Sequence, residues 1–192
     1  MSSGSTAANT RSTKPLCVDL DGTLVATDVT VEGILEFLKT VPWKLFSLIG
    51  ALMSGRPALK KYVARNVKID ASALPYRSQV LAEMRRARAD GRQVLLVTAS
   101  DQSVADAVGE HVDLIDEAVG THSDTNLKGR HKAEYLVSRF GAGGFQYLGD
   151  SSADLPVWSA AGEAHMVAPS PSTRRRAEQS VAKAVVLVER PN

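Results

Sequence analysis

Short apolar runs alternate with amphipathic stretches along most of this chain. The runs "RQVLLVTAS" and "FQYLGD" are typical of buried strands, and each precedes a stretch with helical spacing. Strands that alternate with helices in this way form a parallel sheet covered by helices on both faces. We therefore predict an α/β fold.

The alternation extends from the first apolar run to the end of the chain. The predicted strands cover residues 15–20, 92–100, 116–122, 145–150, 164–169 and 184–189. One predicted helix precedes the second strand, and one lies between each later pair of successive strands. These helices cover residues 77–91, 101–112, 129–141, 154–160 and 172–184. A chain of 192 residues with 44% hydrophobic content can bury one such core and still carry a small insertion.

Residues 30–76 interrupt the alternation with a purely helical pattern. An amphipathic stretch ends at Pro42, residues 43–53 are apolar nearly all round, and Pro57 lies in the first turn of a third helix. This insertion follows the first strand, at the carboxyl edge of the sheet, where ligands bind in folds of this kind. We expect residues 43–53 to form the core of the insertion or to meet a membrane or lipid.

The remaining composition excludes several classes of protein. The net charge of +2 gives no reason to expect a nucleic-acid partner, and a single cysteine, Cys17, cannot form an internal disulfide. Residues 1–14 are polar and lack the apolar core of a secretory signal, so we expect a disordered segment. No stretch reaches the roughly 18 apolar residues that span a bilayer, and we expect a cytoplasmic location.

Polar side chains follow three of the predicted strands at the points where these end. Asp19 and Asp21 follow the first strand, separated only by Leu20, and two like charges so close repel each other unless a cation lies between them. The other polar residues are Thr98 and Ser100 after the second strand, Asp150 and Asp154 after the fourth, and Lys128 before a helix. A parallel sheet brings these strand ends to one edge.

This set of groups suits phosphoryl transfer. Carboxylate oxygens select a hard cation such as Mg²⁺, which bridges to phosphate. Lys128, Thr98 and the amides after Asp21 can bind a phosphate dianion. One aspartate can attack phosphorus, and a second carboxyl two residues away can protonate the leaving oxygen and then activate water.

Four motifs, "DLDGT", "VTAS", "NLKG" and "GDSSAD", resemble in this order those of the haloacid dehalogenase (HAD) superfamily. The resemblance implies a Rossmann-like core with a helical cap inserted after the first motif, as in the phosphoserine phosphatase branch. The implied core covers residues 15–29 and 77–192, and the implied cap covers residues 30–76.

The resemblance also implies a role for each motif residue. Asp19 matches the nucleophile and a metal ligand, and Asp21 matches the general acid and base whose carbonyl binds the metal. Asp150 and Asp154 match the acidic metal ligands of the fourth motif. The residues that match phosphate or substrate contacts are Gly22, Thr23, Asp28, Thr98, Ala99, Ser100 and Lys128.

Several of these assignments have alternatives in the sequence. Lys132, one helical turn after Lys128, is a rival for the role of the lysine that holds nucleophile and phosphate. Asp154 also suits a helix N-cap, and Asp28 also suits a plain loop. Phosphoserine phosphatases have glycines after the hydroxyl of the second motif, whereas this chain has Ala99 and Ser100, so the resemblance does not extend to specificity for phosphoserine.

The extended motifs "CVDLDGTLVATD" and "GDSSADLPVW" are most similar to those of the HAD domain found in front of UbiA-type membrane prenyltransferases. That resemblance implies a small phosphorylated or prenyl-linked substrate and a position at the inner face of a membrane. The resulting expectation is a Mg²⁺-dependent phosphatase. The alternatives are a phosphomutase or phosphotransferase with the same phosphoaspartate, and a regulatory module without catalysis.

Overall fold

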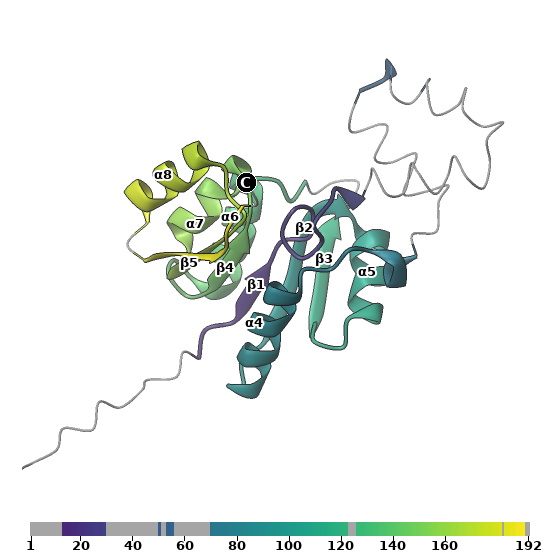
Figure 1. Ribbon diagram of the computed structural model, residues 1–192, viewed down its shortest axis with the longest axis horizontal. Helices are drawn as coiled ribbons and strands as arrows, with labels where there is room; N and C mark the ends of the chain where they lie inside the picture. The colour runs from purple at the N-terminus through teal and green to yellow at the C-terminus, as the bar shows by residue number, and fades with distance from the viewer. Residues whose placement is uncertain are drawn as a thin grey trace, which may run out of the picture.

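The computed structural model describes residues 13–29, 50, 53–55, 70–122, 126–181 and 183–190. Six parallel strands form one sheet in the order β3-β2-β1-β4-β5-β6, with β1 near its centre (Figure 1). The strands are β1 (Leu16–Val18), β2 (Val94–Asp101), β3 (Glu117–Thr121), β4 (Gln146–Gly149), β5 (Glu163–Val167) and β6 (Ala184–Val188). The predicted α/β fold with a parallel sheet is confirmed.

In the described parts of the chain, five α-helices connect these strands. They are α4 (Ser78–Ala89), α5 (Gln102–His111), α6 (Arg130–Phe140), α7 (Leu155–Ala160) and α8 (Pro171–Ser180). Short 3₁₀ helices, η2 (Ala71–Ala73) and η3 (Ser152–Asp154), precede α4 and α7. The helix predicted over 172–184 ends earlier than expected, because Val181 is already extended (φ −127°) and Ala184 begins β6.

The sheet separates two hydrophobic cores, one on each of its faces. Leu16 and Val18 of β1 point to the face that α4 and α5 cover, where they pack with residues such as Met84 and Val108. Cys17 points to the opposite face, which α6, α7 and α8 cover. This alternation follows from the pleat of a strand, which sends successive side chains to opposite sides. Burial of both faces explains why the strand sequences are nearly continuous apolar runs.

Cys17 is completely buried in the central strand and forms no disulfide. Burial raises the pKa of its thiol to about 12. The cysteine is therefore a small hydrophobic residue of the second core.

Most residues of the predicted cap lie outside the described residues, so the division into core and cap stays a prediction. The same holds for the disordered segment predicted over residues 1–14, of which only residues 13 and 14 are described. Of the apolar stretch 43–53, only Gly50 and Met53 are described, and Met53 is 85% exposed. In the parts of the chain that the structure describes, no helix is both long enough and apolar enough to cross a membrane.

Candidate active site

The loop after β1 turns back on itself and carries two of the aspartates. The amide of Asp19 donates to the carbonyl of Leu148 in β4 (3.0 Å), while the carbonyl of Asp19 accepts from the amide of Leu24 (3.2 Å). Gly22 has a φ of +79°, and a Cβ at this position would lie 2.3 Å from Oδ2 of Asp150. Only glycine fits here, because both the backbone angle and the close approach of Asp150 exclude a side chain.

Asp19 forms an ion pair with Lys132, from the first turn of α6. The Nζ atom of Lys132 lies 2.6 Å from Oδ1 of Asp19, and both residues are almost fully buried. Burial lowers the pKa of Lys132, but the charges of Asp19 and Asp154 outweigh burial and raise it above its usual value. Lys132 is therefore a fixed positive charge beside the first aspartate.

Tyr147 of β4 links this ion pair to the fourth motif. Its hydroxyl accepts a hydrogen bond from Nζ of Lys132 (2.9 Å) and donates one to Oδ1 of Asp154 (2.8 Å). Burial, together with the charges of Asp154 and Asp19, raises the pKa of Tyr147 well above its usual value, so the phenol stays protonated. The order of donors and acceptors from Lys132 to Asp154 is thereby fixed.

The second oxygen of Asp154 holds the loop that follows β4. Oδ2 of Asp154 accepts from the amides of Asp150 (3.2 Å) and Ser151 (3.1 Å). Asp154 belongs to η3, and its side chain also closes a capping box with Ser151. The sequence left two roles open for Asp154, an N-cap and support of a metal. Asp154 occupies the N-cap position of α7 without a side-chain capping bond there, and its carboxylate instead serves as the N3 member of the η3 capping box.

Both oxygens of the Asp21 carboxylate accept hydrogen bonds. The amide of Val29 donates to Oδ1 (2.8 Å), and the hydroxyl of Ser100 donates to Oδ2 (2.7 Å). Ser100 lies at the end of β2, so the contact joins the first and second motifs. A hydroxyl partner can donate to a carboxylate or accept from a carboxylic acid, so this bond tolerates protonation of Asp21.

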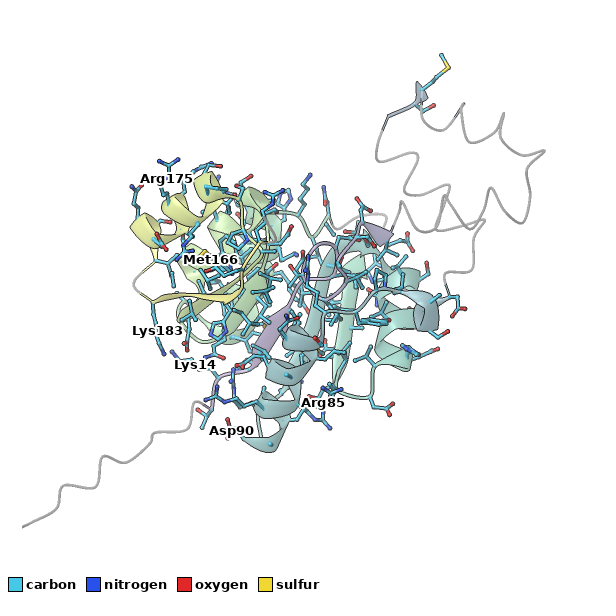
Figure 2. The ribbon with its side chains drawn as sticks, in the orientation of Figure 1. Lys14, Arg85, Asp90, Met166, Arg175 and Lys183 are labelled. Carbon is cyan, nitrogen blue, oxygen red and sulfur yellow. The ribbon has the colours of Figure 1, made fainter. Side chains whose placement is uncertain are left out.

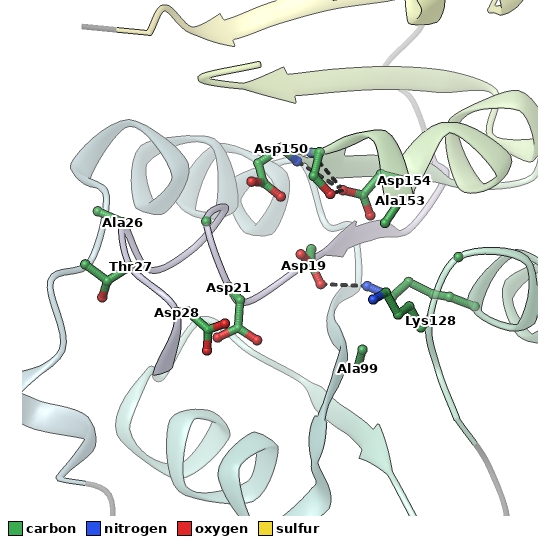
Figure 3. Close-up of a pocket in the computed structure, with 14 residues that line it drawn as sticks. Asp19, Asp21, Ala26, Thr27, Asp28, Ala99, Lys128, Asp150, Ala153 and Asp154 are labelled. Atoms are coloured by element: carbon green, nitrogen blue, oxygen red, sulfur yellow. Dashed lines mark hydrogen bonds and ion pairs between the residues drawn. The ribbon is translucent and has the colours of Figure 1, made fainter. Parts of the chain in front are cut away.

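Asp19, Asp150 and Asp154 form an acidic cluster suited to a divalent metal, since one carboxylate oxygen from each lies within 4.8 Å of the others (Figure 3). Burial, reinforced by neighbouring carboxylates, raises the pKa of Asp19 and that of Asp150 to about 7. A cation among the three would remove this cost of burying charge, and an all-oxygen donor set fits a hard ion. The donors present therefore fit a divalent metal.

A cavity of about 400 Å³ opens over these groups. Most of the predicted site residues line it, including the four aspartates of the first and fourth motifs, Gly22, Asp28, Ala99 and Lys128. Thr23, Thr98 and Ser100 do not line the cavity. Thr98 is fully buried, and its Oγ1 accepts from the amide of Ser100 (3.0 Å).

The lysine beside Asp19 is Lys132 and not Lys128, which motif matching favoured. Lys128 is exposed and precedes Gly129, the N-cap of α6 with a φ of +56°. Lys132 lies on the inner face of α6, and a helical side chain near the N-terminus leans back toward that end and so toward the sheet edge. The sequence contains a signal for this, because positions 132, 136 and 140 share one helix face, of which Leu136 and Phe140 are apolar.

Motif reasoning also missed Tyr147 and Thr27. Tyr147 was read only as part of a buried strand, and no sequence pattern identifies the partners of a buried phenol. Thr27 lines the cavity, and its buried Oγ1 has no hydrogen-bond partner among the described residues. A buried hydroxyl that borders a cavity in this way can serve a ligand.

Comparison with known proteins gives one similar sequence and many similar folds. No protein-family model matches the chain. The uncharacterized protein y4nM of Sinorhizobium fredii is 44% identical over 153 residues, which are 80% of this chain and 30% of that protein. The chain thus spans less than a third of the length of this relative.

The similar solved structures include phosphatases and another hydrolase. A substrate-bound phosphoserine phosphatase has a TM-score of 0.62 at 16% identity, covering 90% of this chain and 92% of that one. The HAD family hydrolase t0658 of Salmonella enterica serovar Typhi has a TM-score of 0.64 at 13% identity, with 90% and 68% covered. A phospho-aspartyl intermediate analogue of phosphoserine phosphatase has a TM-score of 0.60 at 16% identity, with 90% and 92% covered. The six-stranded parallel sheet and its connecting helices therefore form a HAD-like core.

Proposed function

We propose that this chain is a Mg²⁺-dependent phosphatase that hydrolyses a phosphate monoester through a phosphoaspartate on Asp19. The observation that carries the proposal is the contact between Asp19 and Lys132 at the edge of a cavity that also holds the acidic cluster. A nucleophilic carboxylate needs a cation to bring a phosphate dianion close, and Lys132 is the nearest fixed positive charge.

In the first step, an oxygen of Asp19 forms a bond to phosphorus while the bond from phosphorus to the ester oxygen breaks. Asp21 gives its proton to the leaving oxygen, so that a neutral alcohol departs. Val29 and Ser100 hold the Asp21 carboxyl in place during this transfer.

In the second step, Asp21 takes a proton from water, which attacks the phosphorus of the phosphoaspartate. Inorganic phosphate leaves and Asp19 is restored. Mg²⁺ would be held by the carboxylates of Asp19 and Asp150 and by the backbone carbonyl of Asp21. Asp154, in the same acidic cluster, would support it. When bound, the ion neutralises charge on the carboxylates and the phosphoryl oxygens.

The test is Mg²⁺-dependent release of phosphate from 4-nitrophenyl phosphate, with EDTA as the negative control. A labelled phosphoenzyme should be trapped by acid quench and should map to Asp19. The matched variants are Asp19→Asn and Asp106→Asn, the latter an exposed position on α5 bonded only to Gln102. Phosphoenzyme without phosphate release, but with transfer to an added sugar, would favour a phosphomutase. No phosphoenzyme and no release would favour a regulatory module.

We also propose that the substrate is a small phosphorylated metabolite or a prenyl-linked phosphate, acted on at the cytoplasmic face of a membrane beside a UbiA-type prenyltransferase domain. Two observations support this setting. The matched region makes up 30% of the relative y4nM, so most of that protein lies outside the match. Met53, at the end of the apolar stretch, is 85% exposed.

Farnesyl phosphate and 4-nitrophenyl phosphate provide the test of this setting. Met53→Ser should raise the KM for farnesyl phosphate and leave that for 4-nitrophenyl phosphate unchanged. Equal effects on both substrates, or a large fall in Tm, would assign Met53 to the interior of the cap instead.

A further inference from the structure

A second cavity, also of about 400 Å³, adjoins the first. The two share Gly22, Ala26, Asp150 and Ser151 as lining residues, so one ligand can reach both. The remaining lining residues come from the residue before α4, from η3, from the turn after β5 with the start of α8, and from the segment after β6: Arg77, Ser152, Ala168, Ser170, Thr173 and Arg190. Motif reasoning assigned no role to any of these six.

Two guanidinium groups line this second cavity, and neither has an acidic partner among the described residues. Nε of Arg77 donates to the carbonyl of Gly22 (3.2 Å), and no described acidic residue forms an ion pair with Arg77 or Arg190. Arg174 of the neighbouring helix α8 behaves differently, since Glu178 (2.9 Å) and Glu189 (3.1 Å) both pair with it. Glutamates therefore neutralise Arg174 beside the cavity, whereas no described acidic residue pairs with the two arginines that line it.

Among the described residues that line the second cavity, Asp150 alone is acidic. Its carboxylate belongs to the acidic cluster of the first cavity and would be neutralised by a metal there. The second cavity then presents two arginines, together with the hydroxyl groups of Ser152 and Thr173, while the hydroxyl of Ser170 caps α8 and donates to Thr173. Guanidinium and hydroxyl donors in a concave site are the partners of carboxylate and phosphate groups.

We infer that the second cavity binds a second anionic group of the substrate, a carboxylate or phosphate, while the reacting phosphate lies over Asp19. The inference rests on the proposed function and narrows its substrates to phosphate monoesters that carry another negative charge.

Binding to the Asp19→Asn protein in Mg²⁺ tests the inference without requiring turnover. Titration calorimetry compares two matched pairs, glycerol 3-phosphate with 3-phosphoglycerate and glucose 6-phosphate with 6-phosphogluconate. Within each pair the second ligand adds a carboxylate, and the pairs differ in the distance between carboxylate and phosphate. We expect the acid of at least one pair to bind about three- to fivefold more tightly than the partner that lacks the carboxylate.

Arg190→Gln, added to Asp19→Asn, should bring this ratio close to one. The matched control is Arg175→Gln, which removes the same charge from the outer side of α8, where Arg175 projects away from the sheet (Figure 2). It should leave the ratio unchanged. Equal binding within both pairs, failure of the acids to bind, or a ratio that Arg190→Gln does not alter would overturn the inference.

Turnover of 4-nitrophenyl phosphate by the unaltered protein separates this inference from the proposed function. This substrate carries no second anionic group, so its hydrolysis tests the chemistry of Asp19 alone. Hydrolysis combined with equal binding within the pairs removes the second anion site and keeps the phosphatase. No hydrolysis combined with a ratio that depends on Arg190 removes the phosphatase and keeps the anion site.

Discussion

At the amino edge of the sheet, Glu163 is neutralised by its neighbours, whereas at the carboxyl edge three clustered aspartates share one buried lysine. Nζ of Lys183 lies 2.7 Å from Oε1 of Glu163, and Gln146 donates to Oε2. Burial raises the pKa of Glu163, but these contacts outweigh it and lower the pKa below its usual value. At the carboxyl edge, Lys132 is the one described cation paired with Asp19, and burial raises the pKa of Asp19 to about 7.

The difference indicates which edge requires a ligand. At the amino edge the negative charge already has a partner of opposite sign, so this edge needs no ligand. Such pairs often contribute little net free energy to folding. The carboxyl edge has more negative than positive charge, and a cation binds there with a gain in free energy because it relieves the repulsion. The four predictions below test this contrast, beginning with the largest expected effect.

Asp19→Asn should reduce turnover of 4-nitrophenyl phosphate by roughly a thousandfold or more, because the nucleophile is lost. Its Tm should not fall, since the amide removes a buried charge and still accepts from Lys132. The amino-edge counterpart, Glu163→Gln, should keep turnover and lose about 1–2 kcal/mol of unfolding free energy. Steady-state kinetics and thermal denaturation measure both effects, and a Glu163→Gln protein without activity would contradict the contrast.

Lys132→Met should reduce kcat by about a hundredfold, the typical cost of removing one group that stabilises developing charge. Lys128→Met should act mainly on KM and by much less, because Lys128 is exposed and lines the cavity without contacting Asp19. Kinetics of the two variants side by side decide between the two lysines. A larger loss of kcat in Lys128→Met would restore the assignment that the third motif favours.

Without metal, the protein should lose stability as pH rises from about 4 to above 7. The folded pKa values of Asp19 and Asp150, about 7, lie above the ordinary 3.8, so folding favours the protonated carboxyls and becomes less favourable as they ionise. Mg²⁺ replaces these protons, so the rise in Tm that it causes should grow over the same range of pH.

The control for this pH experiment is the Asp150→Asn protein, in which the dependence of Tm on Mg²⁺ and pH should weaken. Glu163→Gln should leave that dependence intact, because Glu163 belongs to the opposite edge. A rise in Tm that stays constant across the range of pH would show that proton release does not accompany metal binding.

Tyr147→Phe should have the smallest effect on catalysis, a loss of several-fold in kcat with KM nearly unchanged. The variant removes the hydroxyl between Lys132 and Asp154, so Lys132 loses the hydrogen bond to Tyr147 and keeps the one to Asp19. The buried oxygen of Asp154 also loses a donor, at a cost of about 1–3 kcal/mol of unfolding free energy. The matched control is Tyr135→Phe, because the hydroxyl of Tyr135 accepts from the exposed Arg139 and lies outside the candidate site.

The sequence was sufficient for the places of the six strands along the chain and for their parallel arrangement, because apolar runs that end in small or polar residues alternate with helical patterns. Motif spacing predicted that Asp19 and Asp150 lie at strand ends, and they directly follow β1 and β4. It was not sufficient for the lysine, because Lys128 and Lys132 differ by one helical turn and only the N-terminus of α6 decides which side chain turns inward. The second cavity was beyond prediction, because it brings together residues that are far apart in the chain.

Cys17 gives this protein an internal reporter of how often its sheet opens. The chain has one thiol, in the central strand, completely buried and with a pKa raised to about 12. An alkylating reagent can therefore react only with molecules in which β1 has separated from its neighbours. The labelling rate would measure the frequency of that event directly. The same measurement with and without Mg²⁺ would reveal whether the ion restrains β1 as well as Asp19, two residues beyond the thiol.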